Sequence, residues 1–88
     1  MPRVSEFFGI VVFMYWFDQQ KHKKPHIHAR YSGSEAVFDL EGNLMEGTLG
    51  RTGDPLIKKW CQLRKSELKK AWELAVIGKE VPWILPLP

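Results

Sequence analysis

The stretch that decides the fold is HIHARYSGSEAVFDL, residues 26–40. Its two halves, residues 26–31 and 35–40, alternate between apolar and polar side chains, which is the period of a β-strand with one buried face. The intervening residues 32–34, Ser-Gly-Ser, are typical of a turn. The stretch therefore predicts two antiparallel strands joined by a short connection.

The first of these strands concentrates chemical groups on one face. In an extended chain His26, His28 and Arg30 point to one side, while Ile27, Ala29 and Tyr31 point to the other. One face then carries two imidazoles and a guanidinium, and the other has the composition of a core.

The rest of the sheet is built around this pair. Residues 8–17 have the Val, Ile and aromatic composition of a buried strand, and Gly9 inside them indicates a bulge or a strand that begins at Ile10. Residues 44–46 can add a short fourth strand after the turn at residues 41–43. Such short connections favour an antiparallel meander.

A helical period replaces the strand period after Gly47. Asp54 and Pro55 form a good helix start, as N-cap and first helical residue, and Gly78 is a suitable C-cap. Most apolar residues between them fall on half of a helical wheel, which predicts one helix over residues 54–78, with a kink near Ser66 also compatible. The predicted fold class is α+β: a three- to four-stranded antiparallel β-meander over residues 8–46, covered by one C-terminal helix, in a single domain of residues 1–88.

Arg64 does not fit the helical pattern, because it lies within the apolar arc. A buried charge must be paired. The sequence offers Glu67, one turn along, or Asp39 of the sheet, and the other possibility is that Arg64 reaches a site at the helix–sheet junction.

The last ten residues, 79–88, form an apolar tail interrupted by proline, which excludes a helix or a central strand. Self-packing is the default expectation for such a tail. Its Trp83 and three large aliphatic residues also suit a surface that docks a partner.

The length and composition of the chain are those of one small globular domain. With 88 residues, 44% of them apolar, it is long enough for one small domain. Cys61 is the only cysteine, so no disulfide can form within the chain, and a cytoplasmic location is expected. The apolar run over residues 7–17 is too short to cross a bilayer as a helix and lacks a signal-peptide cleavage site.

Basic residues cluster before the histidine strand. Lys21, Lys23 and Lys24 lie in a segment without acids, which is typical of a phosphate-binding patch, although a solvated loop would have the same composition. Tyr15 could stack on a base beside them. These four residues are the predicted nucleic-acid contacts.

Two histidines and an arginine can cleave RNA without a metal. One imidazole removes the 2′-hydroxyl proton, the other protonates the leaving oxygen, and Arg30 stabilises the phosphorane. Asp39 on the neighbouring strand could orient an imidazole. The candidate catalytic residues are His26, His28 and Arg30, with Asp39 and Arg64 in support.

Two other interpretations of the histidines stay open. They could ligate a metal with a third ligand from His22, Asp18, Asp39 or Cys61, but Arg30 and the lysines disfavour a cation there. They could also be structural, with their nitrogens bonded to the backbone. No metal and no cofactor is predicted.

Several motifs resemble a known family. Residues 7–10 read FFGI and residues 25–31 read PHIHARY, with further matches at Glu35-Ala36, Asp39-Leu40, Trp60, Glu67-Leu68, residues 72–75, Gly78 and residues 84–87. This pattern is similar to a bacterial family of short proteins, the domain of unknown function 4160. The lysine-rich residues 21–24 and Ile27, where relatives tend to have Phe, depart from the family pattern.

The resemblance implies a small cytoplasmic protein, often encoded beside a second small protein in a toxin–antitoxin-like arrangement. We therefore expect one component of a two-protein module that acts on RNA through its histidines. The alternative is a non-catalytic binding module that docks a small partner through its apolar tail and a sheet edge. Catalysis needs exposed imidazoles, whereas a binding module tolerates buried ones.

Overall fold

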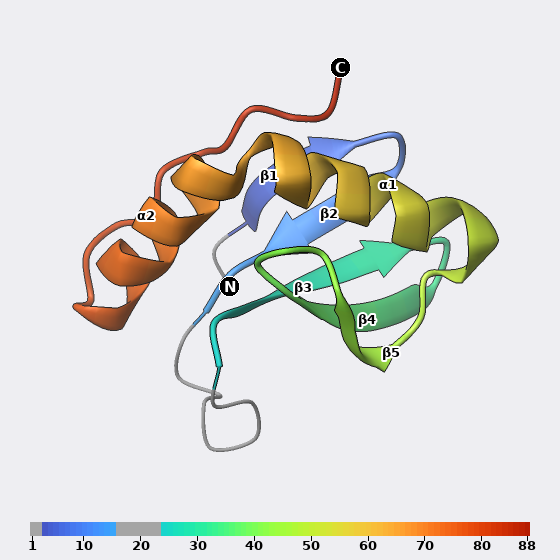
Figure 1. Cartoon of the computed structure of the whole chain (residues 1–88), viewed down its shortest axis with the longest axis horizontal. Coiled ribbons are helices and arrows are strands. Elements are labelled where there is room, and N and C mark those ends of the chain that lie inside the picture. The colour runs from blue at the N-terminus through green and yellow to red at the C-terminus, as the bar shows by residue number, and fades with distance from the viewer. Residues whose placement is uncertain (1–2, 16–23) are drawn as a thin grey trace.

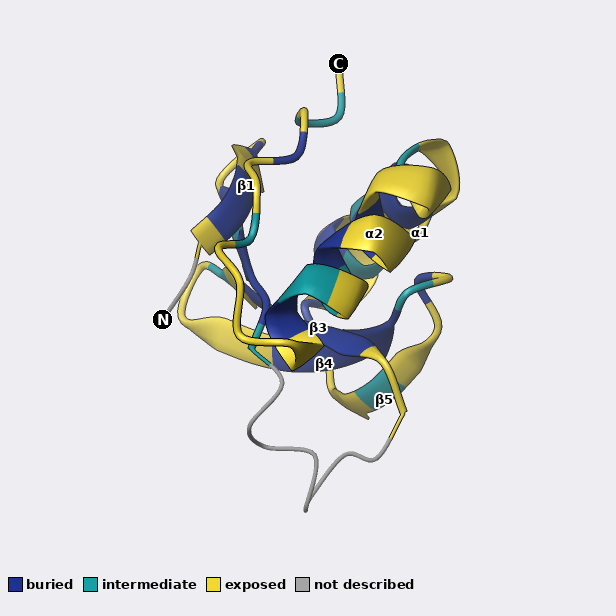
Figure 2. Ribbon diagram, turned by 90° about the vertical axis from the view of Figure 1, so that its left-hand side faces the viewer, coloured by how far each residue is buried: buried dark blue, intermediate teal, exposed yellow. Residues whose placement is uncertain are grey.

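The computed structural model describes residues 3–15 and 24–88 and shows one antiparallel sheet with two helices packed on it. Five strands follow one another as neighbours in the sheet, in a simple meander. The sheet curls, so that β1 stands beside the helices while β3 and β4 lie beneath them (Figures 1 and 2). The elements are β1 (Arg3–Phe7), β2 (Ile10–Phe13), β3 (His26–Tyr31), β4 (Ser34–Asp39), β5 (Leu44–Gly47), α1 (Gly50–Leu63) and α2 (Lys65–Val76).

The α+β class and the antiparallel meander are confirmed, but the predicted number of elements is too small. The sheet has five strands where three or four were expected, and the predicted single helix is two. The additional strand is β1, which pairs with β2 through a turn at Phe8 and Gly9. Both turn residues have positive φ, 48° and 80°, which matches the twist of a two-residue hairpin. Gly9 is thus a turn residue and not a bulge, and β2 begins at Ile10.

The hairpin of β3 and β4 is the best predicted part of the chain. β3 spans His26–Tyr31 as expected, and β4 spans Ser34–Asp39, one residue earlier than expected at each end. Ser32 and Gly33 form the turn, again with positive φ. In this register His28 faces Val37 and Arg30 faces Glu35, and each pair shares a face of the sheet.

Helix α1 begins four residues before the predicted start. Asp54 lies inside the helix and is not its N-cap, because its carboxylate reaches back and accepts from the Leu49 backbone N–H at 2.7 Å and from the Thr48 hydroxyl. These bonds satisfy groups ahead of the helix, so that α1 begins at Gly50 and includes Pro55.

The two helices meet at Arg64, whose backbone (φ −108°, ψ 27°) leaves the helical region. Hydrogen bonds continue through this kink, from the Arg64 N–H to the Trp60 carbonyl and from the Leu68 N–H to the Arg64 carbonyl. The single helix expected over residues 54–78 is therefore bent, two residues before the compatible kink at Ser66. The predicted stop at Gly78 is confirmed, since the N–H groups of Gly78 and Lys79 bond the carbonyls of Ala75 and Leu74 in a Schellman motif.

The core lies between the concave face of the sheet and the helices. Trp60 is its largest fully buried side chain, with its ring 5.2 Å from that of Phe7. The sheet contributes Ile10, Val12, Ile27, Ala29, Ala36 and Phe38, and the helices contribute Ile57, Cys61, Leu68, Ala71 and Ala75. Leu63 also falls on the apolar half of the helical wheel for residues 54–78 and was therefore expected in the core, but it is exposed.

The tail packs on its own chain. Ile84 is buried, and its backbone N–H donates to the carbonyl of Val4 in β1 at 2.8 Å. Figure 2 shows the tail running beside β1. Self-packing, the default expectation, is confirmed for this contact. Neither helix in the described part of the chain has the length and apolarity needed to cross a membrane.

Candidate functional site

The strand β3 brings the two predicted histidines and Tyr15 together. The rings of His26 and His28 lie 5.2 Å apart between centroids, edge to face, and Tyr15 stacks on His28 at 4.3 Å. Alternation along the strand produces the shared face, as expected from the sequence. Tyr15 is thus engaged with an imidazole on one side of its ring, and its stacking on a base stays a prediction.

His26 is fully buried. Its Nδ1 lies 2.9 Å from the backbone carbonyl of Lys24, and its ring packs 5.2 Å from that of Trp72 in α2. These contacts fit the structural interpretation of this histidine, because a general acid or base must reach its substrate. His28 is half-buried.

Arg30 lies at the exposed end of the same face. Its Nε donates to the Glu35 carboxylate at 2.6 Å, and its guanidinium lies 5.2 Å from the centre of the Phe13 ring. Arg30 therefore already has an anionic partner, which would compete with a phosphate.

Asp39 supports a turn. Its carboxylate accepts from the backbone N–H groups of Glu41 and Asn43, both at 2.9 Å, and lies 3.4 Å from the Lys24 ammonium. Burial raises the pKa of Asp39, but the bonds from Asn43, Glu41 and Lys24 outweigh it and hold the pKa below its usual value. Lys24 is thereby placed near the start of β3. Lys21, Lys23, Asp18 and His22 lie outside the described residues.

Arg64 holds the tail. Its Nε and Nη2 donate to the backbone carbonyls of Leu85 and Pro86 at 3.1 and 3.0 Å, and the Trp60 indole N–H donates to the same Leu85 carbonyl. The expected partner Glu67 is present at 3.8 Å as a weaker ion pair. The alternative partner Asp39 instead serves the β4–β5 turn.

The described residues contain no group of three side chains able to hold a metal ion. Cys61, one of the possible ligands, is fully buried, and burial raises the pKa of its thiol to about 12. A thiol that stays protonated is a poor ligand and a poor nucleophile.

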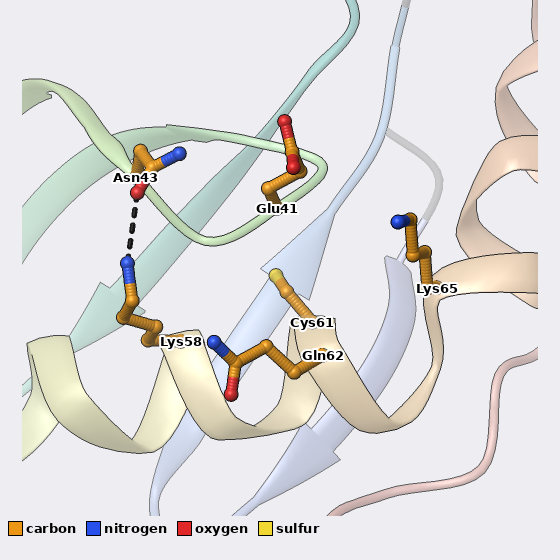
Figure 3. A pocket seen from close by; sticks show the side chains of 6 residues that line it. All are labelled: Glu41, Asn43, Lys58, Cys61, Gln62 and Lys65. Carbon is orange, nitrogen blue, oxygen red and sulfur yellow. Dashed lines mark hydrogen bonds between the residues drawn. The ribbon is translucent and has the colours of Figure 1, made fainter.

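A polar hollow of about 380 Å³ lies between the β4–β5 turn and α1. Its lining residues are Glu41, Asn43, Lys58, Cys61, Gln62 and Lys65 (Figure 3). The turn can approach the helix because Gly42 has no side chain: a Cβ there would lie 2.6 Å from the Lys58 Cα. This hollow was not predicted from the sequence. Lys58, Gln62 and Lys65 recur at helical spacing, which is visible in the sequence. They line a hollow only because the β4–β5 turn packs against this side of the helix.

The two edges of the sheet differ. The β1 edge receives the hydrogen bond from Ile84 of the tail. In the described part of the chain no further strand pairs with β5, and the residues of β5 are exposed apart from Met45, which is half-buried. Leu44 keeps 48% of its surface exposed.

The family model for a domain of unknown function, DUF4160, matches residues 9–73. The chain belongs to this family, as the motifs indicated. No curated protein and no solved structure shows a significant match.

Proposed function

We propose that this protein is the binding component of a two-protein, toxin–antitoxin-like module, and that it takes an extended segment of its small partner as an added strand on β5. The observation that carries the proposal is the exposed outer edge of β5. The last strand of a sheet can add an extended peptide alongside its outer edge through main-chain hydrogen bonds.

The backbone around β5 is fixed before any partner binds. The preceding turn is held by Asp39, which accepts hydrogen bonds from Glu41 and Asn43. At the other end, Gly47 lies so close to β4 that a Cβ would come within 2.4 Å of the Glu35 carbonyl oxygen. An edge that is already ordered loses little conformational entropy when a strand is added.

The opposite edge is a poorer docking site. A partner strand on β1 would have to displace Ile84 from Val4 and release the tail from Trp60 and Arg64. Trp83 and Leu85 of the tail remain exposed, so their side chains could add to an interface with the partner. In the proposed complex the main-chain hydrogen bonds to the partner come from β5 and not from the tail.

Co-purification with the product of the adjacent gene tests the proposal. The Leu44→Lys variant places a charge on the β5 edge and should weaken the complex at least about tenfold. The matched control is Leu63→Lys on α1, because Leu63 has nearly the same exposure, 49% against 48%. Equal loss in both variants, or loss only with Trp83→Ala, would reject docking on β5.

Action on RNA through the histidines stays a prediction with a separate test. His28 is the more accessible of the two imidazoles, so His28→Ala should abolish toxicity on expression while His26→Ala mainly lowers stability. A protein that is toxic with both substitutions, or that is never toxic, would contradict the histidine chemistry.

A further inference from the structure

The positive charge of the chain is concentrated in its helices. Residues 50–76 carry seven basic and three acidic side chains, whereas the rest of the chain carries six basic and seven acidic ones. The basic residues of the helices are Arg51, Lys58, Lys59, Arg64, Lys65, Lys69 and Lys70. The helices therefore carry a basic excess of their own, separate from the lysines of residues 21–24, whose role in phosphate binding stays a prediction.

Most of these lysines are available. Lys59, Lys65, Lys69 and Lys70 are exposed and form no ion pair within residues 3–15 and 24–88. The nearest helical acid in sequence, Glu67, is paired with Arg64. Solvated lysines that outnumber the neighbouring acids, here Glu67 and Glu73, raise the local potential and attract anions.

Part of this basic surface lines the hollow between the β4–β5 turn and the helices. Lys58 and Lys65 rise from α1 and α2 at its two ends, with Gln62 between them on the helix (Figure 3). The Lys58 ammonium is held in place by the Asn43 Oδ1 at 2.8 Å. Lys69 follows Lys65 by one turn of α2 and extends the basic row beyond the hollow.

We propose that this row binds the phosphate backbone of single-stranded RNA, with one nucleotide in the hollow and its flanking phosphates on Lys58 and Lys65. A volume of about 380 Å³ is within the range of small-ligand sites. Glu41 on the turn side repels phosphate, which directs the backbone to the helix side. The Gln62 amide offers a donor and an acceptor to a base edge.

The lining favours RNA over an acidic protein segment. A protein partner would use apolar or aromatic anchors. The exposed large apolar residues of the described chain are Phe8, Leu44, Leu63, Val76, Ile77, Trp83 and Leu85, and none of them lines the hollow. Phosphate binding needs only correctly placed positive charge.

The test is fluorescence anisotropy with a labelled twelve-nucleotide oligouridine, at several salt concentrations. Three contacts, at Lys58, Lys65 and Lys69, predict a slope of log affinity against log salt of about −2. The double variant Lys58→Ala/Lys65→Ala should bind about tenfold more weakly at low salt and lose more than half of this slope. The control Arg3→Ala/Lys79→Ala removes the same charge outside the row of Lys58, Lys65 and Lys69, and should change affinity less than about twofold.

Three results would overturn the proposal: no binding of oligouridine by the parent protein, equal weakening in both double variants, or tighter binding of a twelve-residue polyglutamate than of the RNA. The last result would assign the row to an acidic protein. Leu44→Lys should not weaken RNA binding, because it adds positive charge next to Asn43 of the hollow, so failure of this site and failure of partner docking on β5 are distinguishable.

Discussion

The two edge strands of the sheet, β1 and β5, have different surroundings. At β1, the chain's own tail supplies a backbone hydrogen bond from Ile84, a buried aliphatic side chain and carbonyls for Trp60 and Arg64. At β5, a four-residue strand follows a braced turn and meets solvent. Proteins normally protect exposed sheet edges against pairing with other chains. Within residues 3–15 and 24–88, a segment of the chain covers the β1 edge, and none pairs with the β5 edge. The difference is the basis for our proposal that the β1 edge serves stability while the β5 edge takes the partner strand.

Removal of the tail should have the largest effect. Truncation after Glu80 keeps the helix cap but deletes Ile84 and uncovers Trp60, so we expect a loss of at least about 4 kcal/mol, out of the roughly 5–15 kcal/mol typical of a domain. Urea denaturation measures it. The comparison of edges would fail if the truncated protein lost less than about 1 kcal/mol, since the tail would then not be structural.

The turn before β5 should be next in importance. Asp39→Ala removes the acceptor of two backbone N–H groups and should cost about 3 kcal/mol. Because the pKa of Asp39 is lowered in the folded protein, its contribution is present above about pH 4 and is lost as the pH falls through the lowered value. The parent should therefore lose more stability than the variant between pH 5 and about pH 2. Equal acid sensitivity would show that Asp39 does not brace the open edge.

The hydrogen bonds from Arg64 to the tail should contribute less to the free energy of unfolding. Arg64→Ala deletes two hydrogen bonds to tail carbonyls, with a half-buried side chain, and should cost about 2 kcal/mol. A double-mutant cycle with the truncation checks the assignment, because Arg64→Ala should cost less than about 0.5 kcal/mol once the tail is absent. An undiminished cost would instead assign Arg64 to its pair with Glu67.

Cys61 lies under the β4–β5 turn, next to Gly42. The pH dependence of its thiol therefore measures how well the packing of this turn on α1 excludes water. Its thiol pKa is raised to about 12 in the folded protein, whereas the unfolded thiol ionises near pH 9. Stability should therefore fall as pH rises above about 9, by about 1.4 kcal/mol per pH unit, relative to Cys61→Ala. Parallel pH profiles of the two proteins would mean that the thiol is accessible and the junction with Gly42 is loose.

The sequence predicted the parts of the fold whose period is uninterrupted. β3 and β4 alternate cleanly, so their bounds and shared face were predictable from residues 26–40. β1 was missed because the register shifts between Arg3 and Ser5 and both Val4 and Ser5 are buried, which removes the strand period. The early start of α1 was missed because the Asp54 carboxylate accepts a hydrogen bond from the backbone N–H of Leu49. This bond takes the place of the N-cap role expected for Asp54, and the sequence pattern does not show it.

The candidate site was predictable only in part. The histidine face followed from alternation, but the burial of His26 depends on Trp72, which lies far along the chain in α2. Likewise, the hollow exists because Gly42 lets the β4–β5 turn approach Lys58, a contact that neither segment encodes alone.

The most direct test of the open β5 edge is amide hydrogen exchange with and without the proposed partner, a small protein encoded beside this one. We predict that the amides of residues 44–47 become protected in the complex, while those of residues 3–7 keep the protection they have in the free protein. New protection confined to β1 and the tail, or none at β5 in a complex that forms, would contradict the account.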